Sequence, residues 1–121
     1  MEQTKEKRME AERTKAVLWV SRHPCTNAQI SELADSLGYP VHIKQVSMTI
    51  RDAQQIMDLM RDTNAAEVVV NLPLHMVMEL CHRGVNPIRS VVRERRHDHF
   101  ERVTDVIVKS HPLSYDPVVN P

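Results

Sequence analysis

Glycine is almost absent from the chain, in which Gly38 and Gly84 are the only two among 121 residues. Phosphate-binding P-loops and dinucleotide fingerprints each need several closely spaced glycines, because the backbone must approach the phosphates. The scarcity of glycine therefore argues against both of these nucleotide-binding motifs. Aromatic residues are also scarce, at 3%, so Val, Ile, Leu and the seven Met must fill the hydrophobic core.

Neither charge of one sign nor cysteine is abundant. Lys and Arg together number 16, as do Asp and Glu, and the resulting net charge of zero argues against binding long nucleic acid through charge alone. The composition still allows a small anionic ligand bound in a local pocket. The two Cys lie far apart and do not make a disulfide framework, so we expect a reducing, cytoplasmic compartment.

Long apolar runs are missing as well. No stretch approaches the roughly 18 residues needed to span a membrane, so we expect no membrane partner. The N-terminus is charged and lacks the apolar core of a signal peptide.

The remaining composition is that of one globular domain, with 41% hydrophobic and 26% charged residues. Residues 1–14 have almost no large apolar side chains and predict a charged N-terminal arm, serving solubility or, alternatively, a dimer contact. Residues 15–111 predict the folded domain. Residues 112–121 are proline-rich and predict an irregular tail.

Strand-like and helical patterns alternate along the domain. Unbroken apolar runs, as at 17–20, are typical of strands buried on both faces of a parallel sheet. Thr26 begins a capping-box pattern, Thr49 begins another, and Pro73 suits the first position of a helix. The polar stretch RERRHDHF, 93–100, predicts a turn between the last two strands. We expect strands at 15–21, 41–47, 66–72, 88–93 and 102–109, with helices starting near Thr26, Thr49 and Pro73.

Such alternation predicts a single Rossmann-like α/β domain. We expect a mostly parallel sheet of about five strands, flanked by helices and connected by right-handed crossovers. The short link before the last strand predicts an antiparallel C-terminal edge.

Polar loops follow the first and third predicted strands. In open α/β sheets, ligands bind beyond the carboxyl ends of the strands, where the strand order reverses. If these two strands are neighbours, both loops open on one crevice, where helix N-termini present free N–H groups. The alternative is that the loops are only solvated surface. The candidate catalytic residues are Arg22, as a bidentate phosphate donor, with His23 and His75 for proton transfer; the candidate ligand-binding residues are Ser21, Pro24, Asn71, Leu72, Pro73 and Leu74.

Two further groups are weaker candidates. Cys25 lies at a helix N-terminus, which stabilises a thiolate nucleophile, but no third residue to orient it is apparent. His97, Asp98 and His99 invite a metal interpretation. In a strand only the two His could converge, which are too few ligands for a site, so a solvated turn is favoured. We therefore expect no metal and no cofactor.

At VSRHP and NLPLHMVMELCHRG the chain resembles the small CRISPR-associated proteins of type III systems that act as ring nucleases or cyclic-oligoadenylate binders. The shared residues are Ser21, Arg22 and His23, then Leu72 and Pro73, followed by Glu79, Cys81 and Gly84. The likeness of element order extends over roughly residues 16–109. The resemblance implies a CARF-like homodimer that binds a cyclic oligoadenylate, most often the tetraadenylate, and ends antiviral signalling by cutting the ring.

Cleavage of that kind needs no metal, because a ribose 2′-OH attacks its own phosphate and leaves a 2′,3′-cyclic phosphate. The protein holds the atoms in line and stabilises the developing charge. Under this resemblance Arg22 stabilises charge and His23 or His75 transfers protons. Ser21 and Asn71 orient the ligand, with help from backbone N–H groups near Pro24 and Leu74. A non-catalytic sponge or sensor, and a regulatory protein-interaction domain, are the alternatives.

Overall fold

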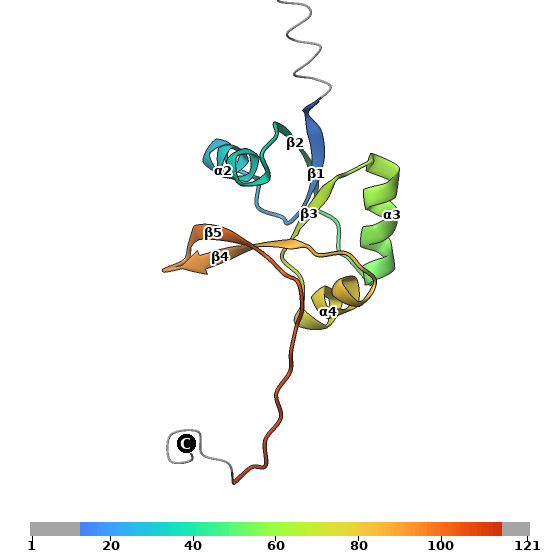
Figure 1. Cartoon of the computed structure of the whole chain (residues 1–121), viewed down its shortest axis with the longest axis vertical. Helices are drawn as coiled ribbons and strands as arrows, with labels where there is room; N and C mark the ends of the chain where they lie inside the picture. The colour runs from blue at the N-terminus through green and yellow to red at the C-terminus, as the bar shows by residue number, and fades with distance from the viewer. Residues whose placement is uncertain (1–12, 115–121) are drawn as a thin grey trace, which may run out of the picture.

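A computed structural model of the chain describes residues 13–114 (Figure 1). The predicted N-terminal arm lies almost entirely outside these residues, as does most of the predicted tail. None of the helices between residues 13 and 114 is long and apolar enough to cross a membrane. The strands are β1 (Lys15–Val20), β2 (Val41–Val46), β3 (Glu67–Val70), β4 (Ile88–Arg93) and β5 (Arg96–Arg102), and the helices are α2 (Asn27–Leu37), α3 (Ala53–Thr63) and α4 (Leu74–His82).

The five strands form one sheet in the order β2-β1-β3-β4-β5. All pairings are parallel except that of β4 with β5. The predicted Rossmann-like α/β fold with an antiparallel C-terminal edge is thus confirmed. The strand order reverses beside β1, because the chain passes first to β2 on one side and then, through α3, to β3 on the other.

The core has two layers because β1 and β3 are buried on both faces, as the apolar runs predict. Val17, Trp19 and Leu33 belong to the layer beneath α2. Leu18 and Ile56 belong to the layer that α3 and α4 cover on the opposite face. Figure 1 shows this division, with α2 on one side of the sheet and α3 and α4 on the other.

Local capping chemistry sets the helix boundaries. The Thr26 hydroxyl accepts the Gln29 N–H and the Gln29 side chain accepts the Thr26 N–H, so the predicted capping box is confirmed. The start predicted for the next helix is three residues early, because Asp52, not Thr49, accepts the N–H of Gln55 and caps α3. Pro73 caps α4 and is not its first residue.

The prediction for the last strand is wrong. β5 occupies Arg96–Arg102, inside the segment expected to be a turn, and residues 103–114 do not form a strand. A two-residue turn joins β4 to β5, with φ of 51° at Glu94 and 65° at Arg95. Such a turn normally has Asn or Gly, so the sequence gives no signal for it. The shorter connection closes a smaller loop at lower entropic cost. Because β5 then occupies the position beside β4, residues 103–109 cannot pair there as predicted.

Candidate functional site

The loops after β1 and β3 begin side by side. Val20 is in register with Val70, and the Asn71 N–H donates a hydrogen bond to the Val20 carbonyl across 3.3 Å. The expectation that these two strands are neighbours is confirmed. Their tips lie where the strand order reverses, the place at which open α/β sheets bind ligands.

Three hydrogen bonds fix the loop after β1. The indole Nε1 of Trp19 donates to the His23 carbonyl at 2.7 Å. The His23 N–H donates to the Ser21 hydroxyl at 3.1 Å, and the Gln45 amide of β2 donates to the Ser21 carbonyl at 3.0 Å. Core and sheet thus hold this exposed loop in one conformation, as ligand binding without a large ordering cost requires.

Two hollows meet at these strand tips. The first, of about 320 Å³, lies on the α2 side, and the second, of about 400 Å³, lies on the side of α3 and α4. Val20, Ser21, His23 and Asn71 line both of them. The two strand ends therefore form the common wall of one divided crevice.

The crevice brings together most of the residues predicted from sequence. Ser21, His23 and Asn71 contact both hollows, Pro24 contacts the first, and Arg22, Leu72 and Pro73 contact the second. His75 is exposed on the first turn of α4 and lines neither of them. Leu74 is 67% exposed and faces another hollow, beside β4 and β5.

The N-terminus of α4 supplies partial positive charge next to the second hollow. Pro73 caps it without a side-chain hydrogen bond, so no side chain satisfies the first N–H groups. The helix dipole favours negative charge at such an end. With the exposed Arg22 guanidinium, this half of the crevice suits an anionic ligand.

The β4–β5 hairpin contributes residues that the sequence analysis missed. Ser90, Val92, Arg95 and His97 line the first hollow, together with Gln29 of α2. Arg95 and His97 were missed because 93–100 was predicted to be a solvated turn. The alternation of Ser90 and Val92 with Arg89 and Val91 was the available signal, since it puts Ser90 and Val92 on one face of β4.

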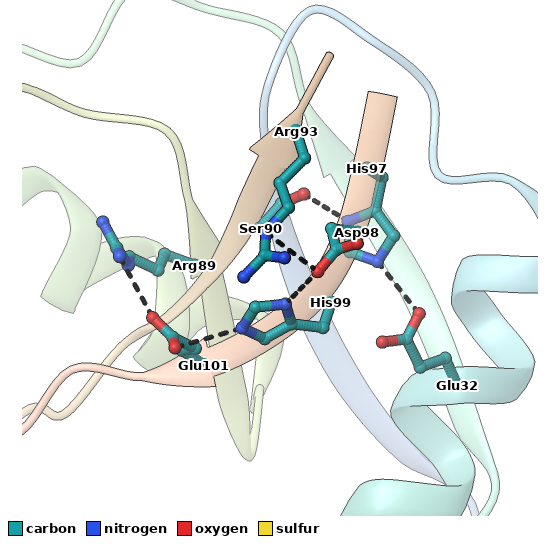
Figure 2. Close-up of polar contacts among 8 residues, drawn as sticks. All are labelled: Glu32, Arg89, Ser90, Arg93, His97, Asp98, His99 and Glu101. Carbon is teal, nitrogen blue, oxygen red and sulfur yellow. Dashed lines mark hydrogen bonds and ion pairs between the residues drawn. The ribbon is translucent and has the colours of Figure 1, made fainter. Parts of the chain in front are cut away.

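A β-bulge separates the two histidines of β5. Val91 pairs with His99 and Val92 with His97, so Asp98 is the extra residue. His97 therefore lies on the α2 face, while His99 lies on the opposite face (Figure 2). The expectation that these two histidines could converge is wrong. Within residues 13–114 no group of three or more His, Cys, Asp or Glu is placed to hold a metal ion.

Two separate polar networks result, and Figure 2 shows both. In one, the His97 ring lies between the Ser90 hydroxyl and the Glu32 carboxylate of α2. In the other, His99 contacts Asp98 at 2.6 Å and Glu101 at 3.1 Å. These hydrogen bonds raise the pKa of His99, and the bond from His99 lowers the pKa of Glu101, with help from Arg89.

Cys25 is a poor nucleophile in this environment. Its side chain is half-buried at the N-terminus of α2, and burial raises the pKa of its thiol to about 11. Burial of this kind disfavours the thiolate form of Cys25. The raised pKa of the thiol argues against Cys25 as a nucleophile.

Comparison of the chain with protein-family models, with curated proteins and with solved structures gives no match. The crevice itself combines positive charge at Arg22 and the α4 N-terminus with polar side chains at Ser21, His23 and Asn71. Such a set can bind a phosphate and move a proton beside it.

Proposed function

We propose that the crevice binds a cyclic oligoadenylate and cleaves it without a metal, as the sequence resemblance implies. The observation that carries this proposal is the hydrogen bond from Asn71 to Val20, because it makes both polar loops walls of one crevice. The absence of a Gly-rich loop fits a ligand held by side chains and helix ends. The two free cysteines, Cys25 and Cys81, support a reducing compartment such as the cytoplasm.

In the proposed reaction the substrate supplies its own nucleophile. A ribose 2′-oxygen forms a bond to the adjacent phosphorus as its proton passes to a base, and the bond to the 5′-oxygen breaks as that oxygen takes up a proton from the same group or from water. Because His23 lies in the crevice and His75 does not, we assign proton transfer to His23. Arg22 and the α4 N-terminus balance the charge that develops on the phosphate. General acid–base catalysis of this kind contributes about 10² to 10⁴-fold.

The ligand also favours a homodimer. A cyclic tetraadenylate has two-fold symmetry, so an isologous pair of protomers would offer it the same residues twice. Each protomer then places its own Arg22 and His23 at a scissile phosphate on its side of the ring.

The test is incubation of the protein with cyclic tetraadenylate and excess chelator, with products separated by chromatography and identified by mass. We expect linear products that end in a 2′,3′-cyclic phosphate. Products with a different end group, or turnover only after metal is added, would contradict the mechanism. Absence of any binding would favour the protein-interaction alternative.

One observation favours a second candidate, a sponge or sensor that binds the ring without cutting it. Of the two histidines predicted for proton transfer, only His23 lies in the crevice, so a second proton-transfer group is missing from the predicted set. In the same assay, tight binding with intact ligand after long incubation would select this candidate.

A further inference from the structure

The hairpin wall of the crevice holds a hydrogen-bonded chain of three side chains. His97 Nε2 lies 2.9 Å from Glu32 Oε2, and His97 Nδ1 contacts the Ser90 hydroxyl (Figure 2). The three residues come from β5, α2 and β4, and Glu32 lies 65 residues from His97 in the sequence. Only the folded structure brings them together.

Packing holds the His97 ring in this orientation. The ring contacts Phe100 with centroids 4.3 Å apart, and Phe100 in turn makes an edge-to-face contact with buried Trp19 at 6.0 Å. The His97 side chain is only 17% exposed and the Glu32 side chain 35%. The contact between Glu32 and His97 is thus partly shielded from water, unlike the network around His99.

Glu32 sets which ring nitrogen of His97 is basic. A carboxylate accepts a hydrogen bond, so Nε2 must carry the proton. Nδ1 is then left with the lone pair that accepts the Ser90 O–H. A hydroxyl, an imidazole and an acid joined in this sequence activate serine nucleophiles, whatever the chain order of the three; here the two ring nitrogens have exchanged roles, with the hydroxyl on Nδ1 and the acid on Nε2.

We propose that Ser90, His97 and Glu32 form a nucleophilic triad whose substrates are small carboxylic esters bound in the first hollow. Ser90 and His97 both line that hollow, and Ser90 is only partly buried. With about 320 Å³ and walls that include Val69 and Val92, it suits a short apolar acyl group. This proposal does not depend on the cyclic oligoadenylate.

The chemistry balances within the hollow. Ser90 Oγ bonds to the carbonyl carbon as its proton moves to His97 Nδ1, and the polar side chains of Asn71 and Arg95, which line the same hollow, would stabilise the negative oxygen. The bond from carbon to the alcohol oxygen then breaks, and His97 returns the proton to that oxygen. Water hydrolyses the acyl-serine by the same route and releases the carboxylic acid.

The test is reaction of the whole protein with an alkyl fluorophosphonate, followed by intact mass measurement and peptide mapping. We expect one adduct per chain, formed on Ser90 with loss of fluoride, and none on Ser90→Ala. The matched control Ser36→Ala, at an exposed serine of α2, should label as the unaltered protein does.

The other members of the triad are tested by labelling rate. His97→Ala and Glu32→Gln should each slow labelling on the order of 10²-fold, because the base or its tautomer is lost. Glu32 is a positioning residue, so Glu32→Asp should recover part of the rate, while Asp35→Asn on the same helix should change nothing. Circular dichroism checks that each variant is folded.

A folded protein that gives no adduct, or an adduct on another residue, would overturn the proposal. So would labelling of Ser90 at an unchanged rate in His97→Ala. Hydrolysis of a short-chain p-nitrophenyl ester with an initial burst would support it independently.

Discussion

The indole Nε1 of Trp19 donates a hydrogen bond of 2.7 Å to the carbonyl of His23, four residues further along the chain. Trp19 is 5% exposed and belongs to the core layer beneath α2, where its ring also contacts Phe100 of β5. One buried side chain thus connects the core, the hairpin and the loop that bears His23. Packing at Trp19 therefore controls the geometry of the crevice.

The first prediction concerns this link. Trp19→Phe keeps an aromatic ring but removes the donor to His23, so we expect a loss of about 1–3 kcal/mol in the free energy of unfolding. The loop should also lose its fixed conformation and bind cyclic tetraadenylate more weakly. Urea unfolding followed by circular dichroism and calorimetric titration measure the two effects. Tyr39→Phe, which also removes one polar atom from a ring, is the control, and equal affinities in both variants would contradict the role of Trp19.

The second prediction separates charge from proton transfer. Arg22→Ala should weaken ligand binding and slow cleavage together, whereas His23→Ala should lower the rate about 10² to 10⁴-fold at little cost in affinity. The controls are Arg51→Ala and His42→Ala, which remove exposed residues outside both hollows. Binding isotherms and single-turnover rates distinguish these outcomes. If His23→Ala keeps its full rate, the proton-transfer role assigned to His23 is wrong.

The third prediction tests the thiol of Cys25. Its pKa of about 11, against an ordinary value of 9.0, leaves about a hundredfold less thiolate near neutral pH. Alkylation by iodoacetamide at pH 8 should therefore be about a hundredfold slower in the native protein than in urea. Mass mapping of the modified peptide measures this for Cys25 alone. Rapid native alkylation would restore Cys25 as a candidate nucleophile.

The fourth prediction is a dependence of stability on pH. Hydrogen bonds from the His99 ring to the carboxylates of Asp98 and Glu101 raise the pKa of His99 above its usual 6.5, so the folded state holds that proton more tightly. The stabilisation is fully present below 6.5 and is lost as pH rises through the higher, folded pKa of His99. Glu101 has a pKa below its usual 4.5, so its contribution is present above 4.5 and is lost as pH falls further.

The network should therefore contribute most between about 4.5 and 6.5. Because His99 is solvent-exposed, the effect should be small and should shrink in high salt. Histidine resonances followed by NMR measure the pKa directly, and His99→Asn should remove the loss of stability above pH 6.5. A midpoint for His99 at or below 6.5 would contradict the prediction.

Sequence pattern predicted most of the fold because the signals concerned are local. The apolar run of β1, the capping box of Thr26 and the helix-ending Gly38 each act within a few residues, and each is found where expected. The same local signals placed Ser21, His23 and Asn71 at the ends of strands. The predicted crevice required β1 and β3 to be neighbours. The sequence could not establish this, because no single segment encodes the strand order.

The sequence by itself determined the α/β class, the two ends of α2 and the polar strand tips, since propensity, periodicity and capping operate between residues close in the chain. Tertiary structure alone decided the bounds of the last strand and its turn, the bulge at Asp98 and the meeting of Glu32, Ser90 and His97. Those depend on a turn with positive φ at Glu94 and Arg95 and on pairing between distant segments. Such features are selected by the packing energy of the whole sheet, which no local pattern encodes.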